Sequence, residues 1–386
     1  MPDYTALKRE EDGPRAAERL LALRRQLRKE IPRKTVRDTL LLATWNIRDF
    51  DSNKFGHGFR LPESFHYIAE IISAFDLVAV QEVNRNLSAL QRVMRLLGRG
   101  WSYIVTDTTE GSSGNQERMA FVYDRRKVTF QHIAGEIVLP QGKKIGGKVI
   151  LPKDCTTSTD IVIPRGKKLK EEIVLPKGTM VEAESQFART PYQVAFQSRW
   201  FKFSLCTVHI YYGAESGDKL KRRVAEIDGI AAFLADRGRK QADNFILLGD
   251  FNIVSPEHQT MKALTRHGFK IPPPLQGRPT NISQEEYYDQ IAFMTRPNEL
   301  QLGDSENNAG VFYLYKSVFR PQDYKTYDKY MVPKLRDFDK KGQPRDAAGK
   351  LKYYTDEWRT FQMSDHLPLW VELKIDFADR YLSGIH

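Results

Sequence analysis

The stretch that most constrains the fold is residues 245–252, which read Phe-Ile-Leu-Leu-Gly-Asp-Phe-Asn. Four consecutive apolar residues that end at a glycine predict a strand buried on both faces. Asp250 and Asn252 follow two positions apart, and in extended chain such side chains point the same way. A turn after a strand would also fit these residues. A carboxylate at the end of a buried strand, however, needs a metal, a proton or a hydrogen bond to offset its desolvation.

Composition and charge bound the class of protein. The chain has 386 residues, of which 41% are hydrophobic and 11% aromatic, so it is globular and long enough for a large α/β domain with insertions. Its formal net charge is +11. This excess suits a polyanionic partner and favours nucleic acid, although a charge spread along the chain could also serve solubility.

Cysteine content and hydropathy exclude several classes. Cys155 and Cys206 are the only cysteines, so neither a disulfide framework nor a cysteine-based zinc site is possible. The first residues are charged and carry no apolar signal segment. No apolar run approaches the roughly 18 residues that a membrane span needs. We therefore expect no membrane span and a cytoplasmic location.

Apolar periodicity predicts alternating strands and helices. A basic amphipathic helix over 15–30 is better explained as a helix docked on the domain than as a nucleic-acid or membrane element. Helices are also predicted over 64–74, 86–97 and 217–236. The predicted strands cover residues 40–48, 76–82, 103–106, 118–123, 128–132, 192–198, 200–208, 245–248, 287–293 and a last strand after Ser364.

Polar side chains gather at the ends of these strands, where ligand chemistry concentrates in α/β proteins. The set holds two imidazoles, four carboxylates and two amides, without a nucleophilic serine or cysteine motif. It suits hydrolysis by an activated water, with a hard divalent cation on carboxylate oxygens and histidines that move protons. The residues are Asn46, Glu82, His209, Asp250, Asn252, Asp289, Asp365 and His366.

Eight short pieces occur in an order that resembles the endonuclease/exonuclease/phosphatase superfamily, most closely its deoxyribonuclease I-like branch. Single pieces such as Gly-Asp-Phe-Asn are weak signals, but eight in order are strong, and the resemblance spans roughly residues 40–375. The pieces are Trp45-Asn46-Ile47-Arg48, Gln81-Glu82-Val83, Glu117-Arg118, Arg189-Thr190-Pro191, Val208-His209, Gly249-Asp250-Phe251-Asn252, Tyr288-Asp289 and Ser364-Asp365-His366.

The resemblance implies a fold and a metal site. The expected fold is α/β (α+β), a two-sheet β-sandwich flanked by helices whose strand ends meet in one cleft. Glu82 matches the family's metal carboxylate and should bind Mg²⁺ or Mn²⁺, with Asn46 and Asp365 nearby. Asp250 and Asn252 match the pair that orients the attacking water and the scissile phosphate.

The resemblance also assigns the remaining polar residues. His209 and His366 match two histidines that clamp the phosphate and manage protons, and which of them is acid or base stays open. Glu117 should hold His209, and Asp289 should hold His366, each fixing a tautomer. The residues expected to contact substrate phosphates are Arg48 and Arg189.

Two departures from the nuclease branch concern its grip on duplex DNA. Asn84 stands where that branch has another arginine, and Asn115 stands where it has a sugar-stacking tyrosine. The catalytic set is complete, so the sequence predicts a Mg²⁺-dependent phosphodiesterase that cleaves nucleic acid, with DNA favoured over RNA. The alternatives are a phosphatase or phosphodiesterase acting on inositol phosphates or phospholipid headgroups, and a catalytically inert nucleic-acid-binding module.

Regions outside the resemblance give the expected domain organisation. Residues 1–37 form a basic helical N-terminal extension, 38–375 the catalytic domain and 376–386 a tail. One insertion, at about 136–183, contains short strands ending in proline that start at 137, 149, 161 and 173, a repeat of twelve residues expected to form a β extension. A second, at about 300–360, is rich in tyrosine and charge; a nucleic-acid contact surface and a packing loop are equally good readings.

Overall fold

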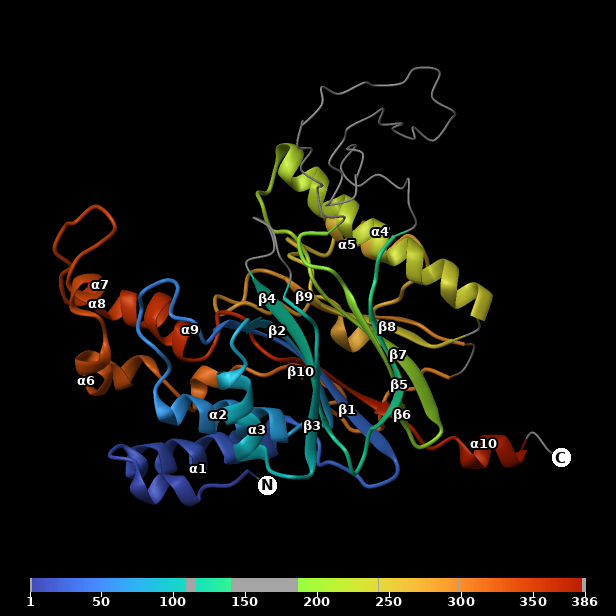
Figure 1. Cartoon of the computed structure of the whole chain (residues 1–386), viewed down its shortest axis with the longest axis horizontal. Helices are drawn as coiled ribbons and strands as arrows, with labels where there is room; N and C mark the ends of the chain where they lie inside the picture. The colour runs from blue at the N-terminus through green and yellow to red at the C-terminus, as the bar shows by residue number, and fades with distance from the viewer. Residues whose placement is uncertain (1, 109–115, 140–186, 242, 297–298, 384–386) are drawn as a thin grey trace, which may run out of the picture.

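Two β-sheets pack face to face and carry helices on their outer sides (Figure 1). The computed structural model describes residues 2–108, 116–139, 187–241, 243–296 and 299–383. The predicted two-sheet sandwich flanked by helices is confirmed. Most of the predicted repeat insertion, residues 140–183, lies outside the described residues, as does Asn115.

The first sheet has six strands in the order β10-β11-β1-β2-β4-β3. The β1–β2 pair is parallel, and the other neighbours are antiparallel. The edge strand β10 comes from within the predicted second insertion, which therefore extends this sheet. The bounds are β1 Thr39–Phe50, β2 Leu77–Asn84, β3 Trp101–Val105, β4 Glu117–Asp124, β10 Ala309–Val311 and β11 Leu369–Lys374.

The second sheet has five strands in the order β5-β6-β7-β8-β9. Here β7 and β8 are parallel, and the remaining pairs are antiparallel. Every residue of β8 is buried, as its apolar run predicts. The bounds are β5 Thr129–Glu136, β6 Tyr192–Ser198, β7 Phe201–His209, β8 Phe245–Asp250 and β9 Asp289–Met294.

The alternation of side chains along β1 separates two apolar cores. Leu40 and Leu42 point between the two sheets, while Leu41 and Ala43 point toward the helices on the outer face of the first sheet. Both faces of this strand are buried, which explains its continuous apolar run.

Helices cover both outer faces of the sandwich (Figure 1). The first three, α1 Gly13–Glu30, α2 Pro62–Ser73 and α3 Ser88–Leu97, lie over the first sheet. The pair α4 Gly217–Gln241 and α5 Gln259–Thr265 covers the second, and α10 Ala378–Ser383 closes the described chain. Leu20, Leu23 and Leu27 of α1 are buried in the outer core of the first sheet, so this helix is packed onto the domain. Within the described residues, no helix has the length and apolar character needed to cross a membrane.

Residues 314–362 form a compact group of short helices beside α2, which we call the helical lobe (Figure 1). It holds α6 Tyr324–Tyr327, α7 Pro333–Asp337, α8 Ala347–Tyr353 and α9 Arg359–Gln362. A loop over residues 338–346 joins α7 to α8, and a π-helical segment, Tyr354–Trp358, joins α8 to α9. The rings of Tyr327, Tyr354 and Trp358 contact one another at centroid distances of 5.6 to 6.1 Å, and all three are buried. The tyrosines of residues 300–360 were considered as a possible nucleic-acid surface. Most of those in the helical lobe are buried and serve packing.

Candidate active site

The predicted site residues come together at one edge of the sandwich. The parallel pairs β1–β2 and β7–β8 end there, while the antiparallel strands β4, β9 and β11 begin there. Strand ends in both sheets therefore contribute side chains to one place. The residues at this edge are Asn46, Glu82, Glu117, His209, Asp250, Asn252, Asp289 and His366, and His366 lies just before β11.

Backbone irregularities aim the polar side chains of this edge. The β1–β2 ladder shifts register after Asn46, and the β2–β4 ladder shifts around Glu82. Glu82 has φ 57° and Asn252 has φ 52°, so both occupy the left-handed region that non-glycine residues rarely adopt. Bulges and strained residues of this kind recur at functional sites, where they redirect a side chain.

Glycine is required where β8 meets β7. Gly249 has φ 129°, and a Cβ atom there would lie 2.2 Å from the carbonyl oxygen of Val208. The close approach of the two strands brings His209 and Asp250 opposite each other in the ladder. The Gly-Asp sequence thus sets the position of the central carboxylate.

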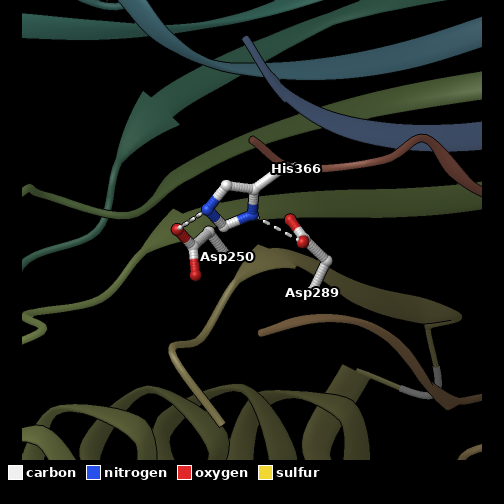
Figure 2. Close-up of side chains that lie close together, drawn as sticks. All are labelled: Asp250, Asp289 and His366. Carbon is white, nitrogen blue, oxygen red and sulfur yellow. Dashed lines mark hydrogen bonds and ion pairs between the residues drawn. The ribbon is translucent and has the colours of Figure 1, made fainter. Parts of the chain in front are cut away.

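Asp250, His366 and Asp289 form a buried chain of contacts. Figure 2 shows the His366 ring between the two carboxylates, with one ring nitrogen toward each. Nδ1 of His366 lies 2.8 Å from Oδ2 of Asp289, and Nε2 lies 3.7 Å from Oδ2 of Asp250. Asp289 thus contacts the histidine that it was expected to hold.

His209 approaches the same aspartate from the other side. Its Nε2 atom lies 3.5 Å from Oδ2 of Asp250, and its Nδ1 atom lies 3.0 Å from Oε2 of Glu117. The contact between His209 and Glu117 is short enough for an ion pair, but its atoms are not aligned for a hydrogen bond. Glu117 also accepts from Nε of Arg189 at 3.1 Å and pairs with Lys54 at 3.6 Å. The Arg189 guanidinium, expected at the phosphate, therefore lies against Glu117.

Arg48 and Asp365 mark the outer side of the site. Nη1 of Arg48 lies 3.4 Å from Oδ2 of Asp365, whose side chain is 37% exposed. Ser364 donates to the carbonyl of Asn46 and accepts from the backbone N–H of His366 at 3.0 Å. The Ser-Asp-His motif thus ties β1 to the segment that carries His366.

Charges around the buried groups set their protonation. Burial opposes ionisation of Asp250, but the charges of His366 and His209 and the hydrogen bonds from Asn252 and Asn46 outweigh it and lower its pKa. Burial also opposes the charge on His366, yet Asp289 and Asp250 raise the pKa of this imidazole well above its usual value. Burial and Asp250 raise the pKa of Asp289. Both shifts favour retention of a proton by the Asp289–His366 pair.

Glu117 stays ionised for a similar reason. Burial raises the pKa of this carboxyl, but the neighbouring His209, Arg189 and Lys54 outweigh the effect and lower the pKa well below its ordinary value.

The donor atoms of the site fit a hard divalent cation. Nδ2 of Asn46 donates to Glu82 and to Asp250, both at 3.0 Å, which leaves Oδ1 of Asn46 buried without a hydrogen-bond partner among the described residues. Oδ1 of Asp289 is unpaired in the same sense. An unsatisfied buried oxygen costs about 1–3 kcal/mol, and a Mg²⁺-type ion, which takes oxygen ligands, would offset that cost.

Two neighbouring groups could hold such an ion. One is the predicted set of Glu82 and Asn46 with Asp365 at its edge. The other is Asp250, Asp289 and His366, whose potential ligand atoms all lie within 4.8 Å of one another. The hydrogen bond between His366 and Asp289 uses atoms of the second group, whereas the Asn46 oxygen of the first is free of such a bond.

Residues on α4 that the sequence analysis did not single out hold the loops of the site. Glu226 accepts from the backbone N–H of Ala188 at 3.1 Å and of Tyr211 at 3.2 Å, beside Arg189 and His209. Arg223 donates to the carbonyl of Asn252 at 2.9 Å. Their position in the sequence could have indicated this role, because both lie on the buried face of α4, where charged residues are unusual.

Comparison with known proteins identifies the family of this chain. Residues 43–284 match the model of the Endonuclease/Exonuclease/phosphatase family. No protein among the curated ones matches the chain. Similar solved structures include a mannosyl-6-phosphatase of Bacteroides thetaiotaomicron, with 18% identity, a TM-score of 0.48 and coverage of 86% of this chain and 99% of that one.

Two further solved structures are similar at lower identity. The catalytic domain of human Nocturnin has 13% identity, a TM-score of 0.47 and coverage of 87% of this chain and 94% of that one. TDP2 of D. rerio, complexed with single-strand DNA product, has 12% identity, a TM-score of 0.44 and coverage of 87% and 98%. The family match spans more than half of the chain, so the protein belongs to the endonuclease/exonuclease/phosphatase family and is a metal-dependent phosphoesterase of that family.

Proposed function

We propose that this phosphoesterase is a Mg²⁺-dependent nuclease that cleaves DNA by attack of an activated water on a phosphodiester. The observation that carries the proposal is the convergence of two histidines on one aspartate. Nε2 of His209 and Nε2 of His366 lie 3.5 and 3.7 Å from Oδ2 of Asp250. The other nitrogen of each ring faces a carboxylate, Glu117 or Asp289.

The protein's own groups divide the chemistry between them. Asp250, whose pKa is lowered, is a carboxylate at neutral pH and accepts a proton from the attacking water. His366, whose pKa is raised, donates through Nε2 to a phosphate oxygen, while Asp289 keeps its ring oriented. The amide of Asn252 donates to the carbonyl of Ile210 at 2.8 Å, which fixes its own orientation beside Asp250.

Glu82 and Asn46 are the proposed metal ligands, and Asp365, which pairs with Arg48, is the further acid that the resemblance assigns to this site. Bound Mg²⁺ would neutralise developing charge on the phosphate and the leaving oxygen. Arg48 and Lys54 add positive charge at the rim of the site, and their side chains are 23% and 36% exposed. In this proposal Arg189 donates to Glu117 and holds that carboxylate in place. Its guanidinium is bound to Glu117 and is not assigned to the substrate phosphate.

Charge supports nucleic acid as the substrate. The chain carries a net charge of +11, and cations at the rim of the site can contact successive phosphates of a strand. DNA is proposed over RNA because the ordered motifs most resemble the deoxyribonuclease I-like branch.

One incubation series tests the proposal. The protein is mixed with plasmid, linear duplex DNA, single-stranded DNA, RNA and inositol phosphates, with Mg²⁺ or with EDTA. We expect cleavage of DNA that requires Mg²⁺ and returns when the metal is restored after EDTA. An Asp250→Asn variant, which keeps the size of the side chain but removes the acceptor charge, serves as the inactive control.

The other outcomes assign other functions. Release of phosphate from inositol phosphates, with every nucleic acid left intact, would replace the nuclease by the inositol-phosphate alternative. Binding of DNA without turnover of any substrate would indicate an inert nucleic-acid-binding module.

A further inference from the structure

The loop between β1 and α2, residues 51–61, presents an aromatic side chain to solvent beside the active site. Phe55 is 52% exposed, and its ring lies 5.3 Å from the ring of Phe361 in the helical lobe. An exposed phenylalanine contributes little to folding. Its position beside charged residues of the site therefore calls for a functional explanation.

The ring of Phe361 is held by contacts with other rings of the helical lobe and of the loop. The His57 ring lies 4.1 Å from it at an interplanar angle of 13°, and Nδ1 of His57 is 3.0 Å from the hydroxyl of Tyr353. The Cζ atom of Arg48 lies 3.9 Å from the centre of the Phe361 ring. Phe361 and Tyr353 are buried and His57 is half-buried, so Phe55 is the most exposed ring of this group.

The loop that carries Phe55 is held in place by buried and partly buried polar contacts. Arg60, which is 5% exposed, donates to the carbonyl of Asp49 at 2.6 Å and to the carbonyl of Met363 at 3.2 Å. The backbone N–H of Gly58 donates to Asn53 at 2.8 Å. A ring on a preorganised loop loses less conformational entropy when a ligand binds.

Two cations connect this aromatic group to the catalytic residues. The Lys54 amine lies 5.1 Å from the centre of the Phe55 ring and 3.6 Å from Glu117, which contacts His209. Arg48, over Phe361, is 3.4 Å from Asp365, the neighbour of His366. A ligand ring on Phe55 would therefore lie next to positive charge and near the phosphate position.

We propose that Phe55, supported by Phe361, is a stacking surface for an unpaired nucleobase next to the scissile phosphate. The inference rests on the proposed nuclease function and deepens it, since it favours single-stranded or frayed DNA over intact duplex. A nucleobase has a flat aromatic face and is joined to phosphates, which matches an exposed ring beside the Lys54 amine, with Arg48 over the neighbouring Phe361 ring. A paired and stacked base has its faces covered by its neighbours, so an unpaired base is required.

The test compares two single strands that differ only in their bases. One is an oligothymidylate, and the other is a strand of equal length built from abasic tetrahydrofuran residues. Phe55→Ala should raise KM for the oligothymidylate about fivefold or more, in line with the effect of removing one stacking residue, and should leave kcat nearly unchanged. The same variant should cleave the abasic strand like the wild type. Phe55→Trp should retain the wild-type KM.

Phe59→Ala is the matched control, because Phe59 lies in the same loop and is 64% exposed. The inference is overturned if Phe55→Ala raises KM by the same factor on both strands, or if Phe59→Ala raises KM for the oligothymidylate as Phe55→Ala does. Wild-type cleavage of both strands with no effect of Phe55→Ala rejects the stacking surface and leaves the nuclease proposal intact. Failure of the wild type to cleave the two single strands, with duplex DNA still cleaved in Mg²⁺, rejects the stacking surface alone, and failure to cleave any DNA rejects both proposals.

Discussion

Asp250 and Asp289 are direct partners in the β8–β9 ladder, and the imidazole of His366 lies between their carboxylates. Adjacent buried carboxylates repel each other unless a positive charge compensates them. His366 supplies that charge, and His209 adds a second contact to Asp250. The arrangement keeps one carboxylate ionised and places protonated nitrogen close to it.

The first prediction concerns the unit formed by His366 and Asp289. His366→Ala should lower kcat by 10²–10⁴-fold, the range for a lost acid or base, and Asp289→Asn should lower it in the same direction. The double variant should lose much less than the product of the two factors, because the residues act together. Steady-state kinetics at saturating Mg²⁺ measures this. Multiplicative losses would show that the two residues act independently.

The second prediction locates the metal. Glu82→Gln should weaken Mn²⁺ binding by at least about tenfold, because it replaces a charged ligand by a neutral amide, whereas His366→Gln should bind Mn²⁺ nearly as the wild type does. Titration calorimetry measures the Mn²⁺ affinity of each variant without any turnover of substrate. The reverse pattern would place the ion in the group of Asp250, Asp289 and His366.

The third prediction concerns packing of the N-terminal helix. Leu23 is fully buried in the core that α1 shares with α2, and Leu21 on the same helix is 57% exposed. Leu23→Ala should lower the free energy of unfolding by about 2–5 kcal/mol, and Leu21→Ala should change it by less than about 0.5 kcal/mol. Urea unfolding followed by circular dichroism compares them. Equal small effects would mean that α1 is a detachable extension.

The fourth prediction follows from the buried carboxyl of Glu226. Burial raises the pKa of this group in the folded protein, although Arg222 and two backbone N–H groups oppose the shift. A folded-state pKa above the unfolded value gives a stability contribution that is fully present below the unfolded pKa, about 4.3, and is lost as pH rises through the folded pKa.

Glu226→Gln removes this titration and so provides the comparison. The free energy of unfolding of the wild type minus that of the variant should fall as the pH rises from about 4 to 7. Denaturant unfolding at several pH values measures the difference. A difference that grows with pH would show that the hydrogen bonds lower the pKa of Glu226.

The sequence predicted the individual strands because they carry strong local signals, and the resemblance to a known family predicted their arrangement in two sheets. The run 245–248 and the runs in β1 and β2 are long, apolar and bounded by polar residues, and tertiary packing did not override them. The predicted site residues at the strand ends lie together for the same reason, since the ends of parallel strands meet at one edge of each sheet.

Other features could not be read from the sequence. Tyrosine occurs both in cores and at binding surfaces, so its abundance in residues 300–360 did not reveal the packed helical lobe. The left-handed conformations of Glu82 and Asn252 leave no mark in the apolar pattern of the sequence. Lys54 and Phe55 lie in an irregular loop, where periodicity gives no information about which side chains face the site.

The most direct measurement of the central claim is cleavage of a labelled single-stranded DNA by the wild type and by Asp250→Asn, each with Mg²⁺ and with EDTA. The account predicts that the wild type cleaves only with Mg²⁺. It also predicts that the variant, with an unchanged circular dichroism spectrum and melting temperature, is at least about 100-fold slower. Equal cleavage by the folded variant, or cleavage that persists in EDTA, would contradict the account.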